Sequence, residues 1–398
     1  MSYELSVFGT NGLTADALAD LIRSASIMHV EEVPDPAANG PALLTAVRGS
    51  RRVDSFSVEG PFHVEPEDVP EDVTAAVLDP QFMYQVLAVG GAQDIPHAVR
   101  FGKKLATAAG GVLVDEQTEE IWPKSSRRKS PRRESGDKPD EVDVTIYFLA
   151  EEAPEDVPAR FLKLAKTYLP ESFPRRFGTY EPLQGRVDRD GEVAFLAACE
   201  EESVTGMFFT TGSPVLLGRL DLPRPRYRRD IGKLSLILAR DALTDAAWRR
   251  SLRRFFMGAA TEFNAFFASA EVLRRTPPEG VPKVGGTELP RRPILFGEWV
   301  GLPPYPQWWN WFGPLWADTV RPYLVGEPEE HPTGLFHAWS EEPLDRDQIA
   351  ALLRDPTQPW VPAQYSAVYG DGVEALRVAE VVPGRLTRNT FRTTDQAS

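Results

Sequence analysis

The sequence contains a single cysteine, Cys199, so no disulfide bond can form within the chain. No stretch approaches the roughly 18 apolar residues that a membrane-spanning helix needs. The N-terminus has no basic segment followed by an apolar one, which is the pattern of a secretory signal. These absences predict a cytoplasmic protein with no membrane partner.

The patterns that usually carry catalysis are also missing. The glycine spacings of phosphate-binding and dinucleotide-binding loops do not occur, and the five histidines lack the spacing of zinc ligands. Ser213 lies in no nucleophile elbow, because no glycine recurs two residues after it. Cys199 precedes three glutamates, whose charges disfavour a thiolate. We therefore expect a protein that is not an enzyme and that uses no cofactor and no metal.

One site for catalysis remains conceivable. His331 and His337 follow Glu329 and Glu330 closely, and Asp345 lies a little further along the chain. Together with nearby tryptophans, these residues would form a histidine–carboxylate site in an aromatic cleft. A hydrolase is therefore the alternative to a binding protein, and a structural module of a larger assembly is a third.

Basic residues are few near the start of the chain, so the negative charge is unevenly distributed. Residues 1–123 contain 19 Asp and Glu against 7 Lys and Arg, within a total net charge of −14. Such a region repels nucleic acid and attracts a basic protein surface. We predict that Glu116, Glu119 and Glu120 contact a protein partner. No pattern in the sequence indicates the oligomeric state.

At 398 residues the chain is too long for one ordinary core. The strand and helix patterns of residues 1–123 follow the order β-α-β-β-(β)-α-β, and a similar order returns after residue 141. This order predicts an α+β fold with two ferredoxin-like α/β-sandwich units and mainly antiparallel sheets. No repeat of individual residues is visible between the units. The expected domains are an acidic α+β domain at 1–123, a basic disordered linker or loop at 124–140, a second α+β domain at 141–275, a linker at 276–292 and a Trp-rich C-terminal extension at 293–398.

Two expectations for the second unit depend on short apolar patterns. Val193–Cys199 matches a strand. A stripe of apolar residues at steps of three and four runs from Trp248 to Leu273 and predicts one long helix that begins at Thr244 and faces the core.

A loop rich in arginine and aromatic residues precedes these elements at Phe173–Pro182. Arg175, Arg176 and Tyr180 are residues of the types that anchor protein interfaces, so they are candidates for partner binding. The alternative is a structural loop held by an arginine–glutamate pair.

Seven of the nine tryptophans lie between Trp299 and Trp360. They admit three interpretations: a packed core, a protein-binding surface, or a cleft that stacks sugars or bases. The proline and glycine spacers favour packing, so we expect Trp299, Trp311 and Trp316 to be buried against the helix predicted over 244–273. Trp308 and Trp309 are adjacent, and we expect one of them to be exposed for partner contact.

The segments Gly301-Leu-Pro-Pro-Tyr-Pro-Gln-Trp-Trp-Asn-Trp-Phe-Gly-Pro-Leu-Trp316, Phe266-Phe-Ala-Ser-Ala270 and Phe177-Gly-Thr-Tyr-Glu-Pro182 resemble bacterial polymorphic-toxin immunity-type proteins. So does Gly110-Gly-Val-Leu-Val-Asp-Glu-Gln-Thr118 in the first unit. The resemblance extends over roughly residues 143–325. It implies an α+β protein that binds one partner stoichiometrically, and it assigns no role to any residue. The sequence thus predicts a protein-binding protein that neutralises a cognate toxin with a basic surface.

Overall fold

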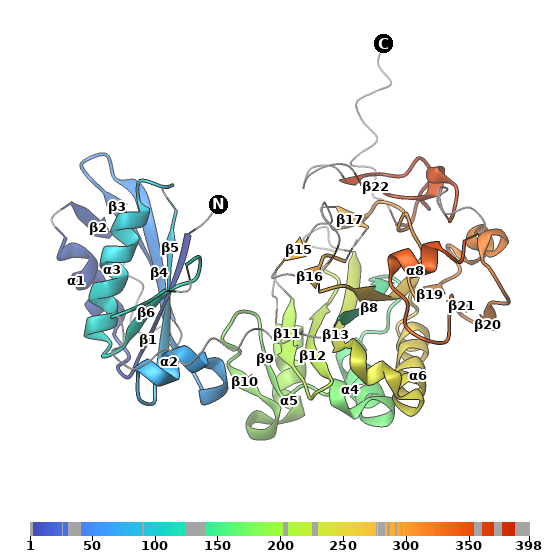
Figure 1. Cartoon of the computed structure of the whole chain (residues 1–398), viewed down its shortest axis with the longest axis horizontal. Coiled ribbons are helices and arrows are strands. Elements are labelled where there is room, and N and C mark those ends of the chain that lie inside the picture. The colour runs from blue at the N-terminus through green and yellow to red at the C-terminus, as the bar shows by residue number, and fades with distance from the viewer. Residues whose placement is uncertain are drawn as a thin grey trace, which may run out of the picture. The chain divides into compact units, whose positions relative to one another are not determined.

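The chain is a mixed α/β protein whose sheets are antiparallel, as predicted (Figure 1). It forms two compact units, Met1–Gly136 and Asp137–Ser398. The computed structural model describes residues 3–386 except for 26, 31–40, 90, 119, 124–139, 202–205, 225–229, 276, 278–282, 285–286, 291–292, 296, 354–359 and 370–375.

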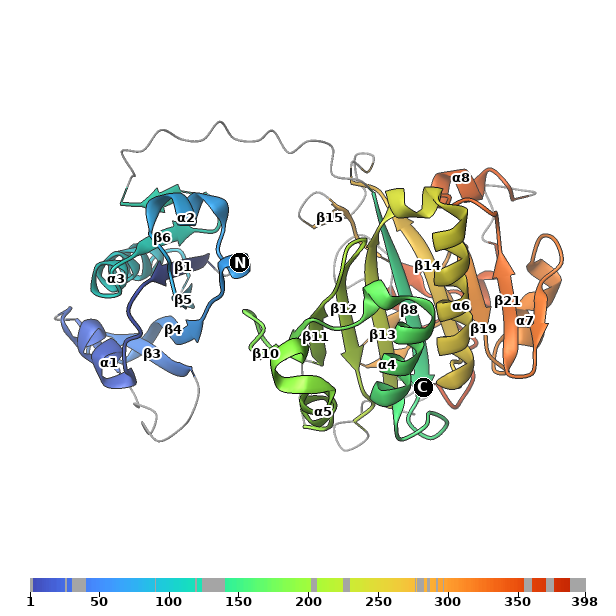
Figure 2. The ribbon, with the colours of Figure 1, turned by 90° about the horizontal axis from the view of Figure 1, so that it is seen from below.

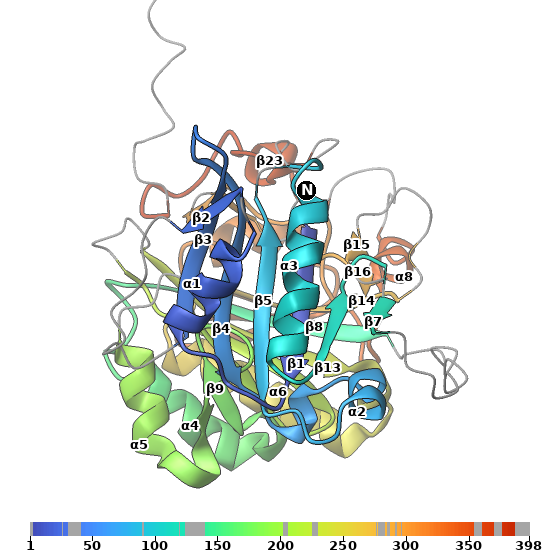
Figure 3. The ribbon, with the colours of Figure 1, turned by 90° about the vertical axis from the view of Figure 1, so that its left-hand side faces the viewer.

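The first unit contains one sheet, in the order β2-β3-β4-β5-β1-β6-β7. Helices α1 and α3 cover one face of this sheet (Figure 3), and α2 covers one end of the other face. The strands are β1 (Tyr3–Gly9), β2 (Met28–Val30), β3 (Ala42–Arg48), β4 (Val53–His63), β5 (Phe82–Ala88), β6 (Val112–Asp115) and β7 (Glu120–Trp122); the helices are α1 (Ala15–Arg23), α2 (Glu71–Ala76) and α3 (Ile95–Ala108).

Period-two alternation builds this sheet. Leu5 and Val7 point into the core beneath α1 and α3, whereas Phe8 packs on the opposite side with Val73 of α2. Thr14 caps α1 by accepting a bond from the backbone N–H of Ala17, at 3.2 Å.

The second unit is built on a ten-stranded sheet, in the order β10-β9-β11-β12-β13-β8-β14-β19-β21-β20. The strands are β8 (Glu141–Leu149), β9 (Arg176–Gly178), β10 (Gly185–Arg186), β11 (Met207–Thr210), β12 (Val215–Asp221), β13 (Ile231–Ala239), β14 (Phe267–Leu273), β19 (Trp309–Phe312), β20 (Glu329–His331) and β21 (Gly334–Ala338). The helices are α4 (Val157–Tyr168), α5 (Val187–Glu200), α6 (Ala246–Glu262), α7 (Ala317–Val320) and α8 (Arg346–Ala350). Short two-stranded pairs are β15 (Lys283–Val284) with β16 (Thr287–Glu288), β17 (Ile294–Leu295) with β18 (Glu298–Trp299), and β22 (Val368–Tyr369) with β23 (Leu376–Arg377).

Helices α4 and α6 lie side by side on one face of this sheet (Figure 2). Strands β19, β21 and β20 come from the Trp-rich residues 293–398 and continue the sheet beyond β14. These C-terminal residues are therefore part of the second unit's own sheet and core.

The two units share one arrangement of strands. The order β3-β4-β5-β1-β6 in the first matches β11-β12-β13-β8-β14 in the second. Along the chain, α1 follows β1 as α4 follows β8, and α3 precedes β6 as α6 precedes β14. The first strands also match residue by residue in type. Glu4-Leu-Ser-Val-Phe8 and Asp143-Val-Thr-Ile-Tyr147 both read acid, aliphatic, hydroxyl, aliphatic, aromatic.

Two predicted elements of the second unit are wrong. Residues Val193–Cys199 lie in helix α5 and not in a strand. A short apolar run does not distinguish the two by periodicity, and its three alanines favour a helix.

The long helix predicted over 244–273 begins at Ala246 and ends at Glu262. Asn264 takes a left-handed conformation with φ 51°, and Ala265 N–H bonds the carbonyl of Ala260 at 2.8 Å. These are the features of a Schellman stop signal. Phe267–Leu273 then forms β14, which is buried on both faces and so lacks the alternation that marks most strands.

Candidate functional site

A row of polar side chains crosses the second unit's sheet on the face opposite α4 and α6. Successive cross-strand partners place Ser235, Thr145, Ser269, Asn310 and His337 on five neighbouring strands. Four of the five are buried, Ser269 being the exception. The Thr145 hydroxyl donates to Asp143 at 2.6 Å and lies 3.1 Å from that of Ser235.

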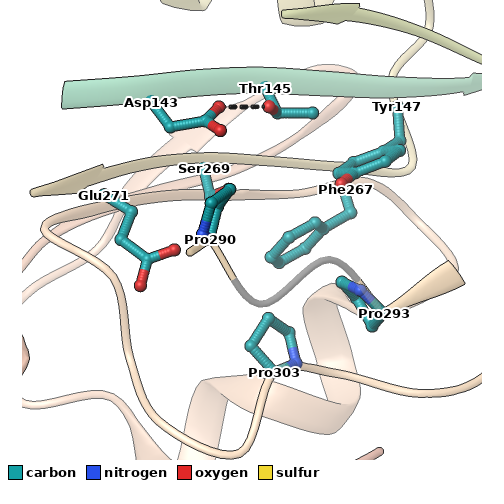
Figure 4. Close-up of a pocket in the computed structure, with 9 residues that line it drawn as sticks. All are labelled: Asp143, Thr145, Tyr147, Phe267, Ser269, Glu271, Pro290, Pro293 and Pro303. Carbon is teal, nitrogen blue, oxygen red and sulfur yellow. Dashed lines mark hydrogen bonds between the residues drawn. The ribbon is translucent and has the colours of Figure 1, made fainter. Parts of the chain in front are cut away.

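A pocket opens on this face where the chain after β14 passes over it (Figure 4). Its cavity volume is about 10 Å³, which is room for a single water molecule. The floor carries Asp143 and Glu271, which are direct cross-strand partners. Its lining residues are Asp143, Thr145, Tyr147, Phe267, Ser269, Glu271, Pro290, Pro293 and Pro303.

Arginines neutralise the buried carboxylates beside this pocket. Arg346 of α8 contacts Glu271 at 2.6 Å and Glu288 at 2.7 Å, and its guanidinium lies 4.2 Å from the ring centre of Tyr305. Arg274 contacts Glu288 at 2.9 Å and also pairs with Asp347. Glu271 and Glu288 are 5% and 1% exposed, so these ion pairs hold α8 and β16 onto the sheet.

Burial raises the pKa of the Glu271 carboxyl, while the charge of Arg346 acts in the opposite direction. The charges of Asp143 and Glu288 raise it further. Each carboxylate in this group faces an arginine or a hydroxyl, and the space between them fits one water. The arrangement therefore serves to dock the C-terminal residues onto the sheet, and it offers little room for a substrate.

The matching face of the first unit carries a different surface, which we call the open acidic face: Glu4, Leu43, Thr45, Ser57, Glu59, Gln85, Leu87 and Glu116. Alternation directs it away from α1 and α3, because Leu5, Leu44, Val58 and Val86 on the same strands all face those helices. Leu43 is 56% exposed, and Glu4, Gln85 and Glu116 are exposed too.

No basic residue stands among these eight. Glu59 is the cross-strand partner of both Leu43 and Gln85, and Glu4 is the partner of Leu87. Acidic side chains thus alternate with two leucines across four strands.

The predicted acidic residues separate onto two sides of the sheet. Glu116 follows β6 on the open acidic face, and its N–H bonds the carbonyl of Glu4 at 3.3 Å. Glu120 pairs with Asp115, whose carboxylate accepts a bond from Tyr3 OH on the helical side. This bond, with burial, raises the pKa of Tyr3 to about 12. Glu119 lies outside the described residues.

The arginine–aromatic loop is a mixture of exposed and buried groups. Arg175 and Tyr180 are exposed. Arg176 is only 8% exposed, and its guanidinium donates to the carbonyl of Leu183 at 2.6 Å. Its proposed role in partner contact is wrong for that reason, because this side chain closes the loop from within.

The tryptophan cluster is a core. Trp299, Trp311 and Trp316 are buried, as expected. The expectation that Trp299 lies against the long helix is wrong: its ring packs on Tyr147 at 5.2 Å and on Phe266 at 5.0 Å between ring centres, on the face of the sheet opposite α6. The expectation that Trp308 or Trp309 is exposed is wrong: they are 0% and 3% exposed and stack on each other at 4.0 Å. The ring of Trp309 packs on Phe256 of α6, and the indole N–H of Trp308 donates to the carbonyl of Ser340. Both adjacent rings are therefore buried.

The two histidines of the hydrolase alternative make separate contacts. His331 lies 3.0 Å from Glu329, whereas buried His337 bonds the carbonyl of Val325 at 2.8 Å. Burial lowers the pKa of His337, which favours the neutral ring. The tryptophans that would line the cleft are packed in the core instead.

Within the described part of the chain, no three His, Cys, Asp or Glu side chains are grouped to hold a metal ion. Among the same residues, no helix combines the length and apolarity needed to cross a bilayer.

Sequence reasoning overlooked Glu4, Leu43, Glu59 and Leu87. Their signal was present as alternation within β1, β3, β4 and β5, but only the strand pairing places them on one face.

Comparison with known proteins gives one structural neighbour to report. No protein-family model and no curated protein matches the sequence. A solved structure described as Pseudomonas aeruginosa T6SS protein PA0821 is similar to part of the chain, with 13% identity and a TM-score of 0.35. The match covers 56% of this chain and 73% of that one. The function of this chain therefore has to be argued from its own residues.

Proposed function

We propose that this chain is a non-enzymatic protein-binding protein that docks a basic partner on the open acidic face of its first unit. The observation that carries the proposal is the exposed sheet surface on which Glu4, Glu59 and Glu116 surround Leu43 and Leu87. Exposed Leu43 and half-buried Leu87 contribute apolar area on docking, and the surrounding carboxylates select a partner of opposite charge.

The residue counts support the same direction of charge. Residues 1–123 carry 19 acidic and 7 basic side chains. Of the described basic residues, Arg23, Arg100, Lys103 and Lys104 lie on α1 and α3, which cover the opposite face of the sheet. Arg48 ends β3 and pairs with Asp94, and Arg51 and Arg52 lie in the turn that follows.

A cognate toxin with a basic surface is the partner that we propose, in keeping with the resemblance to immunity-type proteins. Stoichiometric masking of a basic active cleft would neutralise such a toxin without any chemistry by this chain. The product of the adjacent gene is the first candidate to purify and titrate.

The test compares two baits of equal charge change. Glu59→Gln/Glu116→Gln alters the open acidic face, and Asp16→Asn/Asp20→Asn alters the outer surface of α1. We expect a protein recovered from the native host by the wild-type chain to be retained by the α1 variant and lost from the open-face variant. Its binding should also weaken as salt rises from 50 to about 500 mM, because screening shortens to a few ångströms.

Recovery of the same proteins by all three baits would refute the proposed face. Recovery of none, at low salt and with the adjacent gene product supplied in pure form, would refute the binding function itself.

We also infer that the central strands of each unit form a ferredoxin-like core. The order β6-β1-β5-β4 in the first unit and β14-β8-β13-β12 in the second supports this, since a helix follows the first strand and another precedes the last.

A further inference from the structure

A groove runs between helices α4 and α5 of the second unit, which lie next to each other (Figure 3). Its cavity volume is about 310 Å³, against about 10 Å³ for the pocket over Asp143 and Glu271. The smaller cavity has room for one water molecule, whereas sites for small organic molecules begin at roughly 300 Å³. The groove is therefore large enough for one such molecule.

The floor of the groove is apolar. Leu162 of α4 is 3% exposed, and half-buried Leu196 lines the groove from α5. Ala159, one turn before Leu162, is exposed and contributes only a methyl group, which leaves space beside the two leucines. Val193, one turn before Leu196, is 78% exposed and extends the apolar surface along α5. A hydrocarbon chain placed here would remove this surface from water.

Two lysines of α4 stand at the rim, and only one of them is neutralised. Lys166 Nζ contacts the two carboxylate oxygens of Glu192 on α5, at 2.6 and 2.7 Å, and lies 5.3 Å from the ring centre of Phe173. Lys163 is exposed, and no described side chain forms a hydrogen bond or an ion pair with its ammonium group. Because the charges of Lys166 and Glu192 cancel, the groove keeps one positive charge, at Lys163.

We propose that this groove binds a linear aliphatic carboxylate, with its chain over Leu162 and Leu196 and its head group at Lys163. The apolar floor selects a hydrocarbon, and the unpaired ammonium selects a single negative charge. A nucleic acid does not fit this description, since it is held by several cations that contact successive phosphates. The proposal is independent of the proposed function, which concerns a basic partner on the first unit.

The experiment titrates the full-length chain with hexanoate, octanoate and decanoate below their micellar concentrations, and measures binding by calorimetry. Octanamide, which has the same chain as octanoate and no charge, is the comparison ligand. We expect the affinity to rise about twofold for each added methylene group, which corresponds to burying about half of it, because the groove is open on one side. Octanamide should bind about threefold more weakly than octanoate, as expected for the loss of an exposed ion pair.

Two variants separate the contact of the head group from that of the chain. Lys163→Gln should weaken octanoate about threefold and leave octanamide unchanged, since only the carboxylate loses a partner. Ala159→Phe fills the groove from an exposed helical position and should weaken both ligands by more than about tenfold. The matched controls Arg254→Gln and Ala247→Phe, at exposed positions of α6, should bind both ligands as the wild type does.

Absence of binding by decanoate would overturn the proposal. So would binding that Ala159→Phe leaves unchanged, because the ligand would then contact the protein elsewhere. Equal affinities of octanoate and octanamide for the wild type would overturn the role of Lys163 and with it the choice of a carboxylate. Circular dichroism verifies that each variant is folded. None of these results bears on the proposed function, whose baits are altered in the first unit.

Discussion

The two units place the same kind of sheet face in opposite environments. In the first unit, Glu4, Ser6 and Phe8 point to a face that, among the described residues, α2 and the segment before it cover at one end. In the second, Asp143-Val-Thr-Ile-Tyr147 lies beneath Trp299, three prolines and α8. The difference arises after the last shared strand, since β6 leads only to the three-residue β7 whereas β14 leads to residues that return across the sheet.

This contrast shows what it takes to cover an acidic sheet face. Burying a carboxylate is costly unless a cation and hydrogen bonds accompany it. The second unit supplies Arg346 and Arg274 for that purpose. On the open acidic face of the first unit, by contrast, Glu4 and Glu116 are exposed.

The largest expected effect is the loss of folding stability when a side chain is removed from the covered face, compared with removal of one from the open acidic face. Trp299→Ala removes a fully buried ring that packs on Tyr147, Phe266 and Phe267, and should lower the free energy of unfolding of the second unit by ~3–5 kcal/mol. Leu87→Ala on the open acidic face should cost about 1 kcal/mol or less, because the side chain is only partly covered. Urea unfolding monitored by fluorescence compares them, and equal losses would mean that the open face is covered in solution.

Breaking the buried ion pairs comes next. Arg346→Met leaves Glu271 buried without its arginine, and should cost about 3 kcal/mol. The double variant Arg346→Met/Glu271→Gln should recover part of that loss, because the uncompensated charge is then gone. A double variant no more stable than Arg346→Met would show that packing of the arginine stem dominates.

The third effect is a change in pH dependence, and it is smaller. The folded-state pKa of Glu271 is raised by burial, so its contribution to stability is fully present below the unfolded pKa of about 4.3 and falls as pH rises. Glu271→Gln should therefore gain stability relative to the wild type between pH 4 and pH 7. Urea midpoints at the two pH values measure this, and an opposite sign would mean that Arg346 outweighs desolvation.

A hydrogen bond on the helical side of the first unit provides a smaller effect. Tyr3→Phe removes the bond to Asp115 and should lower stability by about 0.5–1 kcal/mol, since the bond is only partly buried. Amide hydrogen exchange of the residues of β1 and β6 in the full chain is the readout, because tryptophans of the second unit dominate the fluorescence. No shift at all would indicate that water replaces the phenol without cost.

The smallest expected change is on the open acidic face itself. Glu4→Gln/Glu116→Gln should change the free energy of unfolding by no more than about 0.5 kcal/mol, because both side chains are exposed. Calorimetry of the variant beside wild type gives the comparison. A loss of several kcal/mol would mean that these residues serve folding and not binding.

Local pattern predicted much of the fold. The order of strand and helix patterns correctly predicted that the sheets are antiparallel and that helices and strands are mixed in both units. The errors fell on segments made mostly of apolar residues. Val193–Cys199 is a short apolar run, and Phe267–Leu273 continues the apolar pattern of α6, so periodicity could not assign them to strand or helix.

The candidate site was only partly visible in the same way. Glu116 was found through local charge density, and Glu59 was missed because no other acidic residue lies within four residues of it. Arg176, Trp308 and Trp309 have the residue types of interface anchors, but those types also serve in cores when their polar atoms find backbone partners.

The sequence by itself determined the acidic character of the first unit, the antiparallel α+β class and the burial of Trp299, Trp311 and Trp316, because composition and period act over neighbouring residues. Only the tertiary structure decided that Trp309 faces inward and that Glu4, Glu59 and Glu116 share a surface. It also decided that buried Glu271 pairs with Arg346, which is 75 residues away in the chain. These outcomes depend on strand order and register, which join residues far apart in the chain and leave no local trace in it.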